Sequence, residues 1–232
     1  EVDVQDYLSN IKIKTKQSIM GELVDRLKHD AIDLDPDFQR NVVWDNIRKS
    51  QLLESILLQM PIPSFYFDGS DDDKWQVVDG LQRLSTIKEF VVEKTLTLNG
   101  LEFLKKYNGY TFDELPYSLK RRISGFPITM YIIEEGTADE VKFILFKRIN
   151  TGGLTLTAQE IRHALNQGIP AKFIAELANL EVFKDATQHK IATNRMQDRD
   201  FVTRFIAFYV QGHDNYIKSD LDTFMNAGMR TL

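Results

Sequence analysis

The sequence predicts an α+β (mixed α/β) body followed by an all-helical C-terminal region, and three observations predict this fold. Residues 65–67 and 75–78 are short apolar runs on either side of an acidic turn, which indicates paired strands. Residues 128–133 form a β-branched and aromatic run that is typical of a central strand. From about Thr155 to Leu232 only helical periodicity remains.

The N-terminal elements follow from local patterns. The alternation over residues 11–14 predicts an exposed strand, and Ser18 is expected to cap a helix that runs to about His29. A second helix is expected between a cap at Asp45 and a stop at Pro61. Its apolar residues recur with the period of one core-facing side: Leu53, Ile56, Leu57 and Met60.

The later elements are marked by caps and turn residues. A helix is expected after Gly80, a short strand over residues 95–98 and another helix from about Pro116. Residues 137–140 and 157–160 both have the Thr-x-x-Glu pattern of a capping box, so each predicts a helix start.

The change of pattern near residue 155 predicts two parts. We expect a domain over residues 1–154 and a helical extension over residues 155–232 that packs on it. The chain opens on Glu1 rather than Met, which leaves open a longer protein with a further domain after Leu232.

Composition narrows the class of protein. The 232 residues are 43% hydrophobic and 27% charged, as expected for a globular chain with its own core. The absence of Cys excludes disulfides, thiolate metal sites and Cys nucleophiles. Because no apolar span is long enough for a bilayer, we expect no membrane contact and a cytoplasmic location.

The charge balance gives nucleic-acid binding no general support. Lys and Arg number 29 against 34 Asp and Glu, a net charge of -5. The best local basic cluster comprises Lys184, Lys190, Arg195, Arg199 and Arg204. Asp198 and Asp200 interrupt it, so we expect a solvated helix face.

The most informative stretch runs from Trp75 to Ile87. It predicts a buried strand that ends on Asp79, a turn at Gly80 and a helix with Arg83 in its first turn. Free backbone N–H groups and the helix dipole make such a start an anion site, and Arg83 would lean back over it. A structural corner in which Arg83 pairs with Asp79 explains the pattern equally well, so both interpretations stay open.

Two further segments are richer in polar residues and glycine than a core element needs. The first, residues 38–40, lies in an extended stretch before Trp44. In the second, residues 146–153, a helix with a basic last turn runs into Asn, Thr and two glycines. Taken alone, the second segment is explained by an ordinary helix C-terminus, where cations and an Asn or Gly cap are favourable.

Together these segments carry a family resemblance. Three motifs occur in order along the chain: Phe-Gln-Arg at residues 38–40 with a following Trp, Val-Asp-Gly-Leu-Gln-Arg-Leu-Ser-Thr at residues 78–86, and Phe-Lys-Arg-Ile-Asn-Thr-Gly-Gly at residues 146–153. Leu156-Thr157 and Glu160-Ile161 follow the third motif. The chain resembles the DGQQR domain of GmrSD-type restriction proteins, long catalogued as a domain of unknown function and placed in the superfamily of ParB and sulfiredoxin. Three ordered motifs over much of the chain make the resemblance specific.

The resemblance implies a fold and a set of site residues. The fold is a ParB/sulfiredoxin-like small mixed sheet flanked by helices, with a helical region behind it. Matched residue by residue, the site comprises Gln39, Arg40, Asp79, Gly80, Gln82, Arg83, Arg148, Asn150 and Gly152. Leu81 stands where the family has its first Gln, which removes one polar contact.

Family members resemble nucleotide-dependent components of bacterial defence, often joined to a His-Asn-His nuclease domain. From this we expect a nucleoside triphosphate (GTP or ATP) with Mg²⁺, whose phosphates lie at Gly80 and are neutralised by Arg83 and Arg40. Asp79 would hold Mg²⁺ or orient a water, and Asn150 would hydrogen-bond the ribose, a phosphate or that water. The catalytic residues would be Asp79, Arg83 and Asn150, and hydrolysis would proceed without a Walker A lysine, which the sequence lacks.

Three other functions are weighed beside this one. They are a non-enzymatic DNA-sensing or clamp module of ParB type, a DNA-nicking nuclease in which Asp79 and Glu160 share a metal, and an interaction scaffold with a degenerate pocket, to which Leu81 points. The four histidines lack metal-ligand spacing, so three alternatives stay open: a nuclease domain beyond Leu232, a nuclease in a partner subunit, or a protein that never cuts DNA. DNA contact is accordingly expected through another domain or subunit, and oligomerisation stays open.

Overall fold

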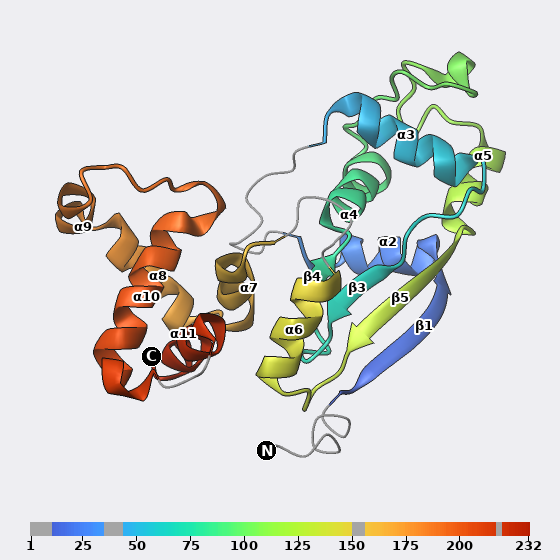
Figure 1. Ribbon diagram of the computed structural model, residues 1–232. Helices are drawn as coiled ribbons and strands as arrows, with labels where there is room; N and C mark the ends of the chain where they lie inside the picture. The colour runs from blue at the N-terminus through green and yellow to red at the C-terminus, as the bar shows by residue number, and fades with distance from the viewer. Residues whose placement is uncertain (1–10, 35–43, 150–155, 217–219) are drawn as a thin grey trace. The chain divides into compact units, whose positions relative to one another are not determined.

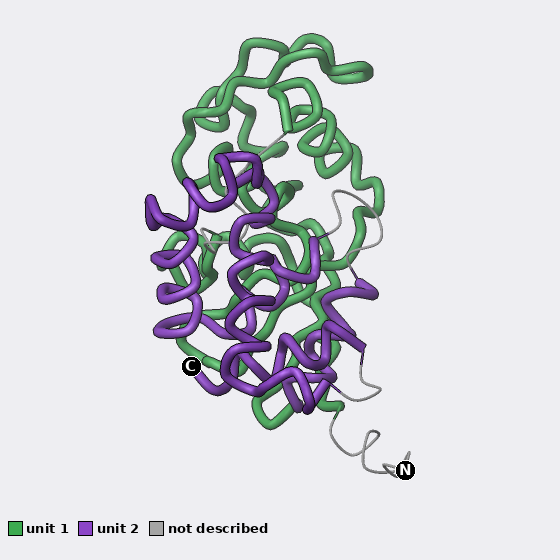
Figure 2. Tube along the Cα trace, turned by 60° about the vertical axis from the view of Figure 1, so that its left-hand side comes forward, with its two compact units in different colours: residues 1–36, 40–137 green, residues 37–39, 138–232 purple. Residues whose placement is uncertain are grey.

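The computed structural model describes residues 11–34, 44–149, 156–216 and 220–232. Two compact units are present: the described residues up to Thr137 form unit 1, and those from Ala138 onward form unit 2 (Figure 2). Unit 1 contains the sheet, and unit 2 is helical throughout its described residues. The expectation of an α+β fold with an all-helical C-terminal region is confirmed.

Unit 1 is built on a five-stranded mixed sheet with the order β1-β5-β3-β4-β2 (Figure 1). The strands are β1 (Ile13–Ile19), β2 (Ile32–Asp33), β3 (Phe65–Asp68), β4 (Trp75–Asp79) and β5 (Pro127–Ile133). β1 is antiparallel to β5, and β3 is parallel to β5 but antiparallel to β4. β2 adds a short parallel edge to β4. The strands predicted from residues 65–67, 75–78 and 128–133 are therefore confirmed.

Helices cover one face of this sheet. They are α2 (Met20–Lys28), α3 (Asn46–Leu57), α4 (Leu81–Ile87), which continues as the π-helix η1 (Lys88–Val92), the 3-10 turn η2 (Lys105–Tyr107) and α5 (Tyr117–Ser124). Phe65 and Phe67 of β3 and Met130 of β5 are fully buried in one core with Leu23 and Leu53 from the helices. The alternate residues of β3 and β5 point to the opposite face, where Tyr66, Thr129 and Tyr131 are partly exposed and Asp68 and Ile133 are buried.

Unit 2 is a helical assembly. Its helices are α6 (Asp139–Ile149), α7 (Ala158–Leu165), α8 (Ile169–Asn179), α9 (Glu181–Ala186), α10 (Gln197–Gln211) and α11 (Leu221–Arg230), with 3-10 turns η3 (Asn194–Met196) and η4 (His213–Asn215). α10 packs on both α8 and α11. A Cβ added at Gly228 of α11 would lie 2.8 Å from Ala207 Cα, so glycine permits the close crossing of α10 and α11.

Two predicted helix caps differ from the structure. β1 extends through Ile19, and the Ser18 hydroxyl donates to the Glu22 carboxylate instead of capping the backbone of α2. The Thr137 hydroxyl likewise bonds the backbone N–H and C=O of Lys12 at 3.3 Å. The Ser18 contact is made with a side chain of α2 itself, whereas the Thr137 hydroxyl joins the residue that precedes β1.

Two smaller expectations about the helices and strands also fail. Residues 95–98 form no strand: Thr95 donates to the Glu89 carbonyl, and Leu98 donates to Tyr110 and accepts from Gly109, which are isolated bonds and not a strand ladder. Met60 lies beyond the end of α3 and is 44% exposed, whereas the other three predicted core residues of that helix are buried. The caps at Asp45 and at Thr157 with Glu160 form as predicted.

Candidate functional site

The turn between β4 and α4 has a geometry that only glycine adopts comfortably. Gly80 has a φ of +107°, in the left-handed region, and links Asp79 at the end of β4 to Leu81 at the start of α4. A Cβ at this position would lie 2.7 Å from Phe65 Cδ1 and 3.3 Å from Arg83 Nη2. The close approach of Phe65 and the backbone angle therefore both require the Gly of the motif.

Arg83 is held under this turn rather than extended over it. Its side chain is largely buried, and its Nη1 donates to the Pro63 carbonyl while its Nη2 donates to the Ser64 carbonyl at 3.2 Å. Nη2 also donates to Asp79 Oδ2 at 3.0 Å. Burial lowers the pKa of Arg83, an effect that the Asp79 carboxylate opposes. Of the two interpretations left open by the sequence, the structure has the Arg83–Asp79 pair.

Asp79 is the more accessible member of that pair. Its side chain is 35% exposed, against 9% for Arg83, and only one of its two oxygens accepts from the guanidinium. Among the described residues, Asp79 Oδ1 has no hydrogen-bond partner. A carboxylate with one oxygen fixed by a buried cation and the other open is oriented for a ligand outside the fold.

Two tyrosines extend the site across the sheet. Tyr66 of β3 is the register partner of both Asp79 of β4 and Tyr131 of β5, so the three residues form one cross-strand row. The tyrosine rings stack with their centroids 4.9 Å apart. Burial raises the pKa of Tyr66, and Tyr131 and Asp79 raise it further. No sequence motif marks this row, although the alternation of residues 65–67 already places Tyr66 on the face opposite the core.

Gln82 connects α4 to the chain before α3. The Gln82 Oε1 accepts a hydrogen bond from the backbone N–H of Trp44 at 3.3 Å. On the other side of the segment, β2 pairs in parallel with β4, where Asp33 is the register partner of Gln76. Gln39 and Arg40 lie outside the described residues. Asp33, which precedes these two residues, is therefore fixed to β4, and Trp44, which follows them, is fixed to α4.

A polar groove opens beside the C-terminal half of α4. It has a volume of about 610 Å³, and Ser85, Lys88 and Glu89 line it from α4 and η1. The lysines on its walls are paired, Lys49 with Glu89 at 2.5 Å and Lys88 with Asp30 at 3.1 Å. A groove of this size with hydrogen-bonding side chains has room for a small organic ligand.

The sequence profile described as "GmrSD restriction endonuclease, N-terminal domain" matches residues 20–167. The chain belongs to this family. The match covers more than half of the chain and includes the whole Asp79–Arg83 turn, so the expected family is confirmed and a defence-related role in a restriction system is supported. Comparison with curated proteins and with solved structures found no match.

The downstream motif of the GmrSD domain lies in unit 2. Arg148 is exposed in the last turn of α6 and has no ion pair with any described residue. Asn150 and Gly152 lie outside the described residues. The structure therefore brings Asp79, Gly80, Gln82 and Arg83 together in unit 1 and leaves the remaining predicted site residues untested.

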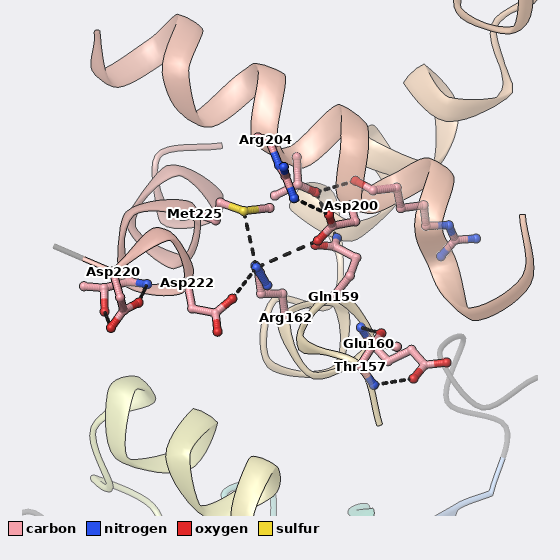
Figure 3. Close-up of polar contacts among 12 residues, drawn as sticks. Thr157, Gln159, Glu160, Arg162, Asp200, Arg204, Asp220, Asp222 and Met225 are labelled. Carbon is pink, nitrogen blue, oxygen red and sulfur yellow. Dashed lines mark hydrogen bonds and ion pairs between the residues drawn. The ribbon is translucent and has the colours of Figure 1, made fainter. Parts of the chain in front are cut away.

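Glu160 lies in unit 2, and Figure 3 shows its contact with Thr157. It is buried, and its Oε2 accepts from the Thr157 N–H at 2.6 Å in the capping box. Arg195 donates to both of its oxygens, at 2.8 and 2.7 Å, and this pairing raises the pKa of Arg195. Within the described ranges no group of three or more metal-ligating side chains is found. These contacts give Glu160 a structural role and leave it no open oxygen for a metal shared with Asp79.

A second buried polar cluster joins α7, α10 and α11 (Figure 3). Arg162 is 2% exposed and donates to Asp222 Oδ1 at 2.9 Å, with Asp200 Oδ1 3.9 Å away. Burial lowers the pKa of Arg162, and the two carboxylates oppose that effect. Its Nε and Nη1 are buried and have no hydrogen-bond partner within the part of the chain that the structure describes. No sequence pattern predicts this cluster, because its members become neighbours only when the three helices pack.

Every helix within the described residues of the chain is too short or too polar to cross a membrane.

Proposed function

We propose that the chain is a nucleoside-triphosphate-binding module of a restriction system, with its site at the Asp79–Arg83 turn. The ligand would be GTP or ATP with Mg²⁺. Family membership supplies the restriction context, and the turn supplies the chemistry. The two charged residues of the motif have different contacts, so we assign them different tasks.

The observation that carries the proposal is the open oxygen of Asp79. Arg83 fixes Oδ2, while Oδ1 of the same half-exposed carboxylate has no partner among the described residues. Carboxylate oxygens are the protein ligands that Mg²⁺ prefers when it is bound with phosphates. Asp79 would therefore bind the cation or orient a water, and Arg83 would position Asp79 rather than contact the phosphates.

The phosphates are proposed to lie at the start of α4. The N–H groups of a first helical turn point outward and favour negative charge, and α4 continues into η1 as a longer helix. Arg40 is the candidate for neutralising the remaining charge. The roles of Gln39, Arg148, Asn150 and Gly152 stay predictions from the family resemblance. The groove at Ser85 and Lys88 offers room for the nucleoside.

Hydrolysis is proposed as a second step that depends on the same carboxylate. With no Walker A lysine in the chain, Asp79 would have to orient the attacking water. A DNA-nicking activity that uses Glu160 as a second metal ligand is disfavoured, because Arg195 and Thr157 occupy both of its oxygens. The clamp hypothesis of ParB type predicts nucleotide binding at this turn without hydrolysis, so turnover separates the two.

The test is calorimetric titration of the chain with ATP, GTP and CTP, with and without Mg²⁺. Asp79→Asn keeps the shape of the side chain but removes its charge, and it should abolish the Mg²⁺-dependent binding. Asp73→Asn is the matched control, since Asp73 is an exposed carboxylate in the turn between β3 and β4. Wild-type affinity in Asp79→Asn, or no nucleotide binding by the wild type, would contradict the proposal.

Arg83 is tested by a pair of substitutions. Arg83→Ala leaves the carbonyls of Pro63 and Ser64 without their donor, so it should lower both the melting temperature and the nucleotide affinity. Arg83→Lys retains the charge but cannot reach three acceptors in the same plane. If Arg83 positions Asp79, Arg83→Lys should weaken the Mg²⁺-dependent affinity more than the Mg²⁺-independent affinity.

A further inference from the structure

We infer that unit 1 contains a DNA-binding surface formed by the segment around η2 and by α5, on which cations contact phosphates and exposed aromatic rings stack on unpaired bases. The inference does not depend on the nucleotide site, since none of the residues at the Asp79 turn belongs to this surface. It places DNA contact within this chain rather than in another domain or subunit.

The charge of this surface contrasts with that of the whole chain. Residues 99–126 contain five cations against three carboxylates, whereas the chain has a net charge of -5. The cations are Lys105, Lys106, Lys120, Arg121 and Arg122. Among the described residues none of them pairs with a carboxylate, so their charge is available to phosphates.

The nearby carboxylates are engaged elsewhere. Asp113 pairs with Lys94 at 2.8 Å. Glu114 accepts from the backbone N–H and the hydroxyl of Thr111, at 2.7 and 2.9 Å. Glu102 accepts from the Gln51 amide at 3.4 Å. The three carboxylates of this segment therefore do not neutralise its five cations by direct ion pairs.

Exposed aromatic rings lie among these cations. Phe103 is 69% exposed and Tyr117 is 76% exposed, although large apolar side chains are normally covered. Phe103 lies just before the η2 segment, and Tyr117 is the first residue of α5. Cations with interleaved aromatic rings are typical of surfaces that bind single-stranded nucleic acid, where phosphates meet the cations and bases stack on the rings.

The surface is rigidly supported by α3. Buried Glu54 accepts from the backbone N–H groups of Glu102, Phe103 and Leu104, at 3.0, 2.8 and 2.7 Å. Just after the C-terminal end of α3, Gln59 Nε2 donates to the Arg122 carbonyl at 3.2 Å. The green segment that contains η2 and helix α5 both lie beside α3 in Figure 1. Because both parts are fixed to the same helix, their cations keep a constant spacing, as a regular phosphate backbone requires.

The test measures binding of the full chain to a labelled DNA duplex and to the corresponding single strand, by fluorescence anisotropy at several salt concentrations. Lys105, Lys106, Arg121 and Arg122 are changed together to Gln. This variant should bind at least tenfold more weakly, and its affinity should depend less on salt, by about one unit of log–log slope for each phosphate that is no longer bound. If the combined variant does not fold, the pairs Lys105/Lys106 and Arg121/Arg122 are changed separately.

The matched control changes the same number of exposed cations elsewhere: Lys14, Lys28, Lys172 and Lys190, each to Gln. This control alters the net charge equally and should retain wild-type affinity. Phe103→Ala with Tyr117→Ala should lower the affinity for the single strand about tenfold and that for the duplex much less.

Three results would overturn the inference. The first is that the wild type does not bind DNA or binds it without dependence on salt. The second is that the wild type and the four-cation variant bind with equal affinity. The third is that the four-cation variant and its control are weakened equally. Single-strand affinity that is unchanged by the aromatic substitutions would overturn the stacking role of Phe103 and Tyr117.

Discussion

At the scale of single residues, Glu54 shows how one buried carboxylate organises a long loop. Its carboxylate accepts hydrogen bonds from the backbone N–H groups of residues 102–104, which belong to no strand. We expect Glu54→Gln to lower the free energy of unfolding by about 1–3 kcal/mol, because the amide cannot satisfy all three donors. Urea unfolding measures this decrease, with exposed Glu135→Gln as the control that should change little.

The same residue predicts a dependence on pH. Burial tends to raise the pKa of Glu54, but the three N–H groups outweigh it and hold the pKa below its usual value of 4.5. A lowered folded-state pKa means that the stabilisation is present above about pH 4.5 and is lost as the pH falls through the folded-state value. As the pH is lowered from neutral through this range, the wild type should therefore lose more stability than Glu54→Gln. Parallel pH profiles would contradict this assignment.

Gly80 allows backbone strain to be separated from steric clash. Gly80→Ala should cost about 1–3 kcal/mol for the left-handed backbone and a further amount for the contact with Phe65. Gly109 has a φ of +88° with nothing near its absent Cβ, so Gly109→Ala should show the backbone cost alone. Denaturant unfolding of both variants gives the difference. Equal destabilisation would mean that Phe65 moves aside freely.

At the scale of elements, the packing of α7 against α10 and α11 contains an incompletely satisfied cation. Arg162 has two buried donor atoms that find no partner among the described residues, and Asp222 also pairs with Lys147 at 3.1 Å. Arg162→Met removes the unsatisfied donors and fills much of the same space, so it should leave the stability of unit 2 unchanged or raise it by about 1–4 kcal/mol. Arg162→Ala should lower it, because a cavity replaces the side chain.

Differential scanning calorimetry of the two Arg162 variants provides the measurement. If Arg162→Met destabilises unit 2 as much as Arg162→Ala does, the guanidinium has partners that its contacts with the described residues do not show. The comparison thus distinguishes a structural cation from one that serves a bound anion.

The elements also show what sequence can predict. The strands at residues 65–68, 75–79 and 127–133 were predictable because alternation and β-branched residues are local signals. Residues 95–98 share that composition but make only isolated backbone hydrogen bonds, that of Thr95 to Glu89 and those of Leu98 with Tyr110 and Gly109. The lack of a pairing strand therefore decided the outcome. The two-residue strand β2 carries too little pattern to be predicted.

The same division applies to the candidate site. Asp79, Gly80 and Arg83 are close in sequence, so their turn could be predicted from a local motif. The row of Asp79, Tyr66 and Tyr131 depends on the register of three strands, which the sequence does not specify. Whether Arg83 reached outward or inward depended on the carbonyls of Pro63 and Ser64, which lie in a distant segment.

At the scale of the whole molecule, the two units differ in what they contribute. Unit 1 contains the predicted turn, the polar groove and the basic surface, all supported by one sheet and its helices. Unit 2 contains the Glu160–Arg195 pair and the Arg162 cluster, whose contacts serve helix packing. A ligand at the turn should therefore stabilise unit 1 directly.

This distribution predicts how nucleotide should affect melting. A ligand that binds only the folded state at one hundred times its Kd stabilises by about 2.7 kcal/mol, which raises the melting temperature of a chain of this size by roughly 5–10 °C. We expect this increase with Mg²⁺ and nucleotide in the wild type and in Asp73→Asn, but not in Asp79→Asn. Hydrogen exchange should locate the added protection at β3, β4 and α4. Protection confined to unit 2 would move the nucleotide away from the Asp79 turn, because binding there must slow the opening of the strands that hold it.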